Sequence, residues 1–236
     1  MNKKALIIGI NYTGSNVSLT GCINDANHMK SFLTNNGYND IIMLTDNTIP
    51  PTKNNIIQYI NNWLIQADNA VFYYSGHGGD IVGYNENCIF PIDYTINGVL
   101  SDQDLRNILV NAMPSSTNLL CIIDACKSAT LMELKWTYCI NNNNIENIND
   151  NPYPISDCYS VCFSSSKDTQ DSENLNDGSK SSGVFTDYFI EYYNPNGSYY
   201  DLLNQITNAI IQNYNFKQTP CLSFGHNISY NNIIIL

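Results

Sequence analysis

Basic side chains are scarce in this sequence. Lysine and arginine together number 10, against 21 aspartates and glutamates, which gives a formal net charge of −11 at pH 7. A protein that follows nucleic-acid phosphates needs clustered cations to release counterions from the polymer. We therefore expect no nucleic-acid partner, and the acidic balance favours a ligand with positive charge.

Long hydrophobic runs are absent as well. The N-terminal run ALIIGI is too short for the core of a signal peptide, and no small-residue cleavage site follows it. No stretch approaches the length of a membrane-spanning helix, so no membrane partner is expected. The eight cysteines include no CxxC pair and no tight spacing with histidine, which disfavours a disulfide framework and a zinc site. The prediction is free thiols in the reducing cytoplasm.

Short, nearly continuous apolar runs recur along the chain, which is the pattern of strands buried on both faces of a sheet. Helical patterns alternate with them, for example at 23–33 and 57–64. This alternation predicts an α/β fold, a three-layer sandwich in which helices flank a mostly parallel central sheet. The expected strands are 4–10, 40–44, 70–74, 119–124, 159–165 and 221–224.

Two polar tracts interrupt this pattern. The segment 139–155 is rich in asparagine and has two prolines near its end, and the segment 164–183 is rich in serine and aspartate. Such compositions are typical of exposed loops. We expect one domain, in which the first tract is a loop between two portions of the sheet.

Two expected strands end on residues that can carry chemistry, at the sheet edge where α/β proteins bind ligands. One strand is followed by His77, which has a glycine on either side, and another is followed by Cys126. If the strands are neighbours, the imidazole can generate the reactive thiolate, and the amides of Gly78 and Cys126 are candidate oxyanion donors. The alternative is a buried cysteine and a histidine that caps a turn.

Six sequence blocks point to a known family. They stand in the order GCINDA (21–26), YSGHGG (74–79), CIFPIDY (88–94), IIDACKS (122–128), SSSKDTQ (164–170) and QTPCLS (218–223). In these blocks the chain resembles the metacaspases, the caspase-like cysteine peptidases of non-animal lineages. The resemblance implies a single caspase-like catalytic domain over 1–236, with a large-subunit-like portion (1–138), a linker loop (139–157) and a small-subunit-like portion (158–236).

The resemblance also implies a chemistry. In a Cys–His dyad, His77 carries the proton and Cys126 attacks the peptide carbonyl to give a thioester, with no third orienting residue required. Metacaspases cleave peptides and proteins after Arg or Lys.

The matching specificity pocket contains Asp25 and Asp124, with Cys22 and Ser75 alongside. Two carboxylates in a partly desolvated pocket pair with a guanidinium and reject an acidic side chain. The alternative is that Asp25 only complements its helix dipole and that Asp124 only caps a turn.

Many metacaspases also need calcium, bound away from the catalytic centre. The matching positions are Glu86, Asp102, Gln103 and Glu133, and hard oxygen ligands suit Ca²⁺. Gln103 supplies only a neutral carbonyl, which weakens the expected affinity. The alternative is that these four residues are solvated surface groups.

The chain departs from the family directly after the nucleophile. Metacaspases usually carry histidine and then Ser-Gly there, whereas this chain has Lys127, Ser128 and Ala129. A lysine beside Cys126 favours the thiolate, but loss of the glycine stiffens a loop that shapes the pocket. A catalytically weak or inactive regulatory protein, or a related peptidase of altered specificity, therefore stays open, although retention of His77 and Cys126 favours an enzyme.

The sequence shows no proline-rich or zinc-finger prodomain, so we expect the compact form of the family. The tract 139–155 contains no Lys or Arg, which excludes a cut there by the enzyme's own specificity. We expect a monomer that stays largely uncut.

Overall fold

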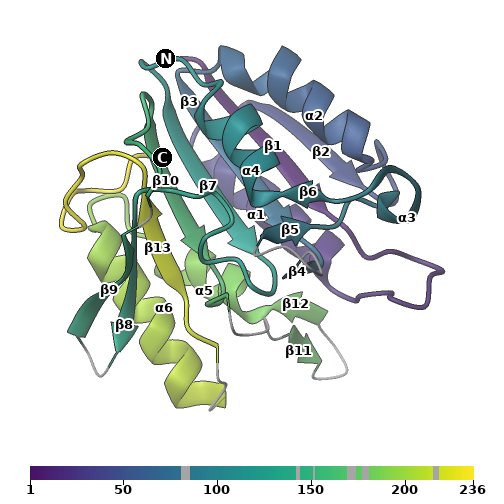
Figure 1. Ribbon diagram of the computed structural model, residues 1–236. Helices are drawn as coiled ribbons and strands as arrows, with labels where there is room; N and C mark the ends of the chain where they lie inside the picture. The colour runs from purple at the N-terminus through teal and green to yellow at the C-terminus, as the bar shows by residue number, and fades with distance from the viewer. Residues whose placement is uncertain (81–85, 142–143, 151, 169–173, 177–180, 215–217) are drawn as a thin grey trace.

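The computed structural model describes the chain except residues 81–85, 142–143, 151, 169–173, 177–180 and 215–217. Its centre is an eight-stranded sheet in the order β2-β1-β3-β7-β10-β13-β8-β9 (Figure 1). The strands from β2 to β10 pair in parallel, and β13, β8 and β9 continue the sheet in antiparallel pairs. These strands are β1 (Lys3–Gly9), β2 (Asp40–Thr45), β3 (Asn69–Ser75), β7 (Asn118–Asp124), β8 (Trp136–Asn141), β9 (Asn144–Asp150), β10 (Tyr159–Ser164) and β13 (Cys221–Phe224).

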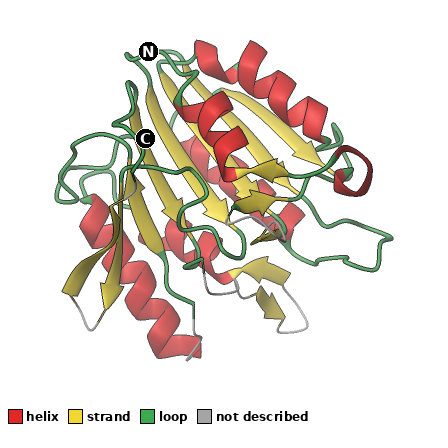
Figure 2. Cartoon of the chain, in the orientation of Figure 1, coloured by secondary structure: helices red, strands yellow, loops and turns green. Residues whose placement is uncertain are grey.

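Helices cover both faces of this sheet (Figure 2). On one face lie α2 (Lys53–Asn62), the short η1 (Leu64–Gln66), α4 (Asp102–Leu105) and the π-helical turn η2 (Arg106–Val110). On the other lie α1 (Cys22–Asn35), α5 (Val184–Tyr192) and α6 (Tyr199–Tyr214). The four-residue α3 (Tyr94–Asn97) connects two strands of a smaller sheet. The predicted three-layer α/β sandwich is confirmed, with a sheet that is mixed.

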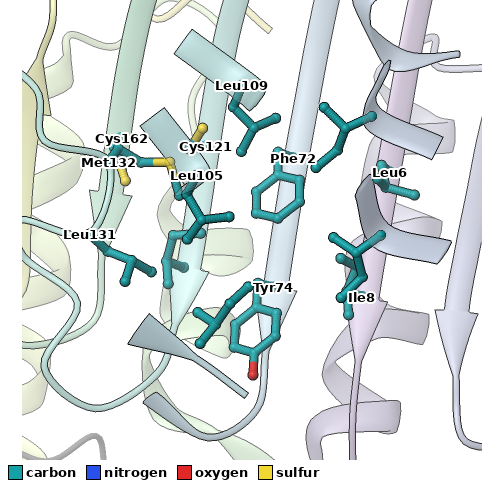
Figure 3. Close-up of a cluster of buried hydrophobic side chains, with 14 of the residues drawn as sticks. Leu6, Ile8, Phe72, Tyr74, Leu105, Leu109, Cys121, Leu131, Met132 and Cys162 are labelled. Carbon is teal, nitrogen blue, oxygen red and sulfur yellow. The ribbon is translucent and has the colours of Figure 1, made fainter. Parts of the chain in front are cut away.

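The apolar runs form strands because both of their faces are buried. All seven residues of β3 are buried, and so are six of the seven in β7. Alternate residues pack on opposite layers: Phe72 and Leu6 lie in the cluster under α2 and α4, part of which Figure 3 shows, whereas Val71 packs toward α1 and α5. In the described part of the chain no helix is both long and apolar enough to cross a membrane.

The prediction of a loop at 139–155 is wrong over most of that segment. Residues 139–141 complete β8 and residues 144–150 form β9, and this antiparallel pair extends the sheet beyond β13. Cys139 pairs directly with Cys221 of β13, so β8 has a buried partner, while β9 is an edge strand with exposed polar residues. An edge strand needs few apolar side chains, so the asparagine-rich sequence of β9 did not have the apolar pattern that predicts a strand.

Two small sheets lie beyond the carboxyl ends of the central strands. One contains β4 (Gly78–Asp80), β5 (Asn87–Ile89) and β6 (Leu100–Ser101). The other pairs β11 (Asn174–Asn176) with β12 (Ser181–Gly183), inside the tract that the composition predicted to be a loop. Both lie next to the candidate site.

Candidate active site

Three neighbouring parallel strands bring the candidate residues to one edge of the sheet. Gly9 of β1 pairs with Ser75 of β3, and Ser75 pairs with Asp124 of β7. His77 and Cys126 each lie two residues beyond this shared register, so the expected adjacency of their strands is confirmed.

The two segments touch at Gly78. A Cβ built there would overlap the carbonyl oxygen of Cys126 and would approach Cβ of Ala125 to 3.1 Å, so only glycine fits this close approach. The Cys126 side chain is partly exposed, whereas the other seven cysteines are buried. The chain therefore offers one solvent-accessible thiol, next to the histidine segment.

The imidazole of His77 is oriented by the main chain. Its Nε2 lies 2.7 Å from the carbonyl oxygen of Val17. A carbonyl only accepts hydrogen bonds, so Nε2 bears the proton and Nδ1 is the nitrogen that can accept a proton from a thiol. Sequence reasoning missed Val17 because a backbone oxygen has no residue-type signature.

Asp25 and Asp124 form a buried acidic pair. Asp25 is 1% exposed and Asp124 is 6% exposed. The Ser75 hydroxyl donates to Asp25 Oδ2 at 3.0 Å, and the Gly183 amide donates to Asp25 Oδ1 at 2.9 Å. Asp25 thus interacts across the sheet end with β3 and β12, which a role confined to its own helix does not explain.

Asp124 is held by the start of α5. Its Oδ2 accepts hydrogen bonds from the Thr186 amide at 3.2 Å and the Thr186 hydroxyl at 2.7 Å. A Cβ on Gly183 would overlap this carboxylate and would lie 3.2 Å from Asp25 Oδ2, so Gly183 sits against both acids. Sequence reasoning missed Gly183, the last residue of the polar tract 164–183, and Thr186, just after it, because neither stands in a distinctive motif.

Burial and mutual repulsion keep this pair from ionising freely. Burial first, and then the charge of Asp124, raise the pKa of Asp25 to about 8. Burial likewise raises the pKa of the neighbouring Cys22 thiol to about 12, so that thiol stays protonated at neutral pH. A cation placed between the carboxylates would relieve the repulsion, which makes the pair a natural receptor for a positive group.

The loop after Cys126 is fixed at two further points. The Lys127 ammonium pairs with the carboxylate of Asp80 in β4, and Lys127 has a left-handed φ of 54°. The Asp168 carboxylate accepts hydrogen bonds from the Thr130 amide at 3.1 Å and the Thr130 hydroxyl at 2.7 Å. The only sequence signal for Asp168 was its place in the block SSSKDTQ.

The four expected calcium ligands are only partly gathered. Asp102 and Glu133 are buried, Glu86 is half-buried and Gln103 is exposed. Burial first, and then neighbouring acids, raise the pKa of Asp102 and of Glu133. Glu133 Oε2 is buried without a hydrogen-bond partner, which fits a site that accepts a cation. Within the described ranges, however, no group of three or more His, Cys, Asp or Glu residues is placed to hold a metal.

Solved structures share the fold. Protein GSU0716 from Geobacter sulfurreducens superposes with a TM-score of 0.70 at 18% identity, covering 97% of this chain and 95% of its own. Caspase-1 from Spodoptera frugiperda gives 0.67 at 14% identity, covering 96% and 87%. The Drosophila initiator caspase Dronc gives 0.62 at 10% identity, covering 98% and 81%. The fold is therefore caspase-like.

Sequence relatives are closer. Metacaspase-1 of Debaryomyces hansenii is 31% identical over 95% of this chain and 65% of its own length. Metacaspase-1 of Scheffersomyces stipitis is 31% identical over 95% of this chain and 71% of its own, so the chain spans about two thirds of these relatives. The family model for the metacaspase peptidase C14 domain matches residues 3–135, more than half of the sequence. The chain belongs to the metacaspase family.

Proposed function

We propose that this protein is a cysteine endopeptidase that cleaves peptides and proteins after Arg or Lys. The observation that carries the proposal is the convergence of a solvent-accessible thiol, an oriented imidazole and a buried acidic pair at the ends of β3 and β7. The thiol and imidazole supply the chemistry, and the acids supply the specificity.

The reaction follows from the dyad. His77 Nδ1 takes the proton of Cys126 as the sulfur attacks the scissile carbonyl carbon, and the Gly78 and Cys126 amides bind the resulting oxyanion. The imidazolium then protonates the leaving amine, the C–N bond breaks and a thioester remains. Water, deprotonated by the imidazole, attacks the thioester, and the released sulfur regains its proton.

The specificity follows from the acidic pair. A guanidinium of the substrate binds between Asp25 and Asp124, with the Ser75 hydroxyl and the Cys22 thiol alongside. It takes the place of the Gly183 amide as the partner of Asp25. A carboxylate in the same position would meet two buried acids without a counter-charge, so acidic residues are rejected.

A panel of fluorogenic peptides that differ only at the residue before the cut tests this specificity. We expect the Arg peptide to be cleaved faster than the Lys peptide, because only guanidinium makes a bidentate pair with carboxylates. The Asp peptide should be slower than the Arg peptide by about 10³-fold or more, since unpaired buried charge costs several kcal/mol. Equal cleavage of the Asp and Arg peptides would disprove the pocket assignment.

We also propose that Ca²⁺ stimulates the enzyme by binding Asp102 and Glu133, with Glu86 and Gln103 as outer ligands. In support, burial and the charges of Asp102 and Glu86 raise the pKa of Glu133, and burial and the charge of Glu86 raise the pKa of Asp102, so added positive charge is favourable there. Ca²⁺ should raise the Tm and the activity of the wild type. Glu133→Gln should weaken Ca²⁺ binding, measured by titration calorimetry, by about tenfold or more, because hard cations favour charged ligands.

Glu191→Gln is the matched control for this calcium prediction. Glu191 is an exposed residue of α5, and the substitution removes the same charge from a solvated site. Identical calcium affinity in the wild type, Glu133→Gln and Glu191→Gln would exclude this location of the site.

Two further properties belong to the proposal. A monomer is supported by the β8–β9 hairpin, since β9 occupies the edge of the sheet and places the charge of Glu146 there. A cytoplasmic location is supported by the eight free cysteines, seven of which are buried thiols that need no disulfide to pack.

A catalytically weak or inactive regulatory protein is the second candidate. Lys127 and Ala129 are the observations that favour it. The ion pair between Lys127 and Asp80 ties up the charge beside the nucleophile, and Ala129 is buried in the small cluster with Cys139 and Cys221. A wild-type protein that binds Arg peptides without cleaving them would support this candidate.

A further inference from the structure

We propose that two buried tyrosines, Tyr12 and Tyr74, are positioning residues that hold the His77 peptide in its working orientation. This inference rests on the proposed role of His77. The Tyr74 hydroxyl donates to the His77 carbonyl at 2.8 Å, and the His77 amide donates to the Tyr12 hydroxyl at 3.2 Å. Both main-chain polar groups of His77 are therefore bound by tyrosine side chains.

The protons of this network can be assigned. The Tyr12 hydroxyl donates to the Phe90 carbonyl at 2.6 Å, so its oxygen remains available to accept from His77. The Tyr74 proton goes to the His77 carbonyl, and the two hydroxyl oxygens lie 3.2 Å apart. Burial raises the pKa of both phenols, so both stay protonated donors. Figure 3 shows the Tyr74 hydroxyl pointing away from the other labelled side chains of the cluster.

The tyrosines act where the sheet ladder stops. Gly76 donates to the Asp124 carbonyl at 3.4 Å, and beyond that point His77 bonds to Tyr12, to Tyr74 and to the Phe90 amide. A Cβ on Gly76 would lie 2.7 Å from the Tyr74 hydroxyl and 3.2 Å from the Tyr12 hydroxyl, so the turn passes directly over both. The two tyrosine hydroxyls therefore add to the Phe90 amide in holding the peptide that carries the imidazole.

Tyr12 also packs against the imidazole ring of His77. The ring centroids of Tyr12 and His77 lie 4.7 Å apart, and the Phe90 ring meets the imidazole edge-on at 6.5 Å. With Nε2 on the Val17 carbonyl, the ring has little freedom to rotate, and Nδ1 is held in one direction.

Tyr12 has a left-handed φ of 51°. Such a backbone is costly for a residue with a large side chain and persists where the surroundings impose it. This cost is consistent with a placement selected for contact with His77.

The test uses Tyr12→Phe and Tyr74→Phe in the full chain, with Tyr199→Phe as the matched control. Tyr199 is also buried, and its hydroxyl also accepts a main-chain amide, from Ile235 at 3.3 Å, on the α6 side of the sheet. Each site variant should lower kcat for an Arg peptide by about tenfold with KM within about twofold, because a misaligned base affects the chemical step more than binding. Tyr199→Phe should leave kcat unchanged.

Rates are expressed per Cys126 thiol that can be alkylated by iodoacetamide, which removes any effect of misfolded protein. If kcat per reactive thiol in Tyr12→Phe and Tyr74→Phe matches that in Tyr199→Phe, the positioning role is refuted. The rate of alkylation is a second readout that needs no peptide substrate, and both site variants should slow it about fivefold at pH 7. A wild type that cleaves no Arg or Lys peptide would count against the proposed function, whereas an unchanged alkylation rate in both variants would count against the tyrosines.

Discussion

Replacing Cys126 with alanine is expected to reduce kcat/KM for an Arg peptide by at least about 10⁴-fold, the loss typical of removing a covalent nucleophile. The sulfur forms the thioester, and the other seven cysteines are buried; the Cys22 thiol beside the acidic pair also has its pKa raised to about 12. Steady-state kinetics with a fluorogenic peptide measures the loss.

His77→Ala should cost nearly as much, and the double variant should be no slower than either single variant. Groups that act as one unit lose their joint effect when either is removed, so the two losses do not add. Additive losses would mean that the two residues act in separate steps, against the dyad.

Cys158→Ala supplies the matched control. Cys158 is buried, and its thiol approaches the Val110 carbonyl at 3.5 Å, under the helices of one face. Its removal should leave kcat/KM unchanged, whereas Cys126→Ala should abolish the single rapid alkylation of the native protein. Residual peptidase activity in Cys126→Ala that survives alkylation would rule out this nucleophile.

The sequence predicted the parts of the site that depend on strand order. His77 and Cys126 follow short, nearly continuous apolar runs, and neighbouring parallel strands must end at one edge of the sheet, so their proximity could be predicted. The contact between Asp25 and Gly183 could not be predicted. The two residues are 158 positions apart, and the polar tract that ends at Gly183 has no pattern that predicts its path. The Val17 carbonyl left no signal at all, since any residue supplies one.

The missed β8–β9 hairpin has a related cause. β9 has one paired and one open edge, so nothing requires it to be apolar, and the alternation that identifies strands is lost among its asparagines. β10, by contrast, has neighbours on both sides, and its burial made YSVCFS recognisable. Prediction from sequence thus failed at the β8–β9 end of the sheet, whereas the opposite edge strand, β2, was predicted from its apolar run at 40–44.

Asp25→Asn is expected to lower kcat/KM for Arg peptides by about 10²- to 10³-fold, the usual effect of removing one partner of a buried charge pair. Asparagine keeps the shape, and its oxygen can still accept from the Gly183 amide. The variant also removes a carboxyl group whose ionisation is costly at this buried site, so its Tm should equal or exceed that of the wild type. The rate of Cys126 alkylation, which does not use the pocket, should stay within about twofold.

The same carboxyl predicts how Arg cleavage depends on pH. With a pKa of about 8 in the free enzyme, Asp25 is mostly protonated at pH 6 and becomes ionised as the pH rises through 8. A guanidinium binds the ionised form and lowers that pKa, so kcat/KM should rise between pH 6 and 8 while kcat at saturating substrate does not follow Asp25.

The control for this pH profile is iodoacetamide alkylation of Cys126, which follows the dyad alone. The ratio of kcat/KM to the alkylation rate should rise with pH in the wild type and stay flat in Asp25→Asn, because asparagine does not titrate. If this ratio depends on pH in the same way in the two proteins, the substrate's positive charge is bound at another site. The acidic pair would then have only a structural role at the end of the sheet. A rise that Asp25→Asn abolishes, with Tm and alkylation preserved, ties the preference for Arg to one buried carboxyl group.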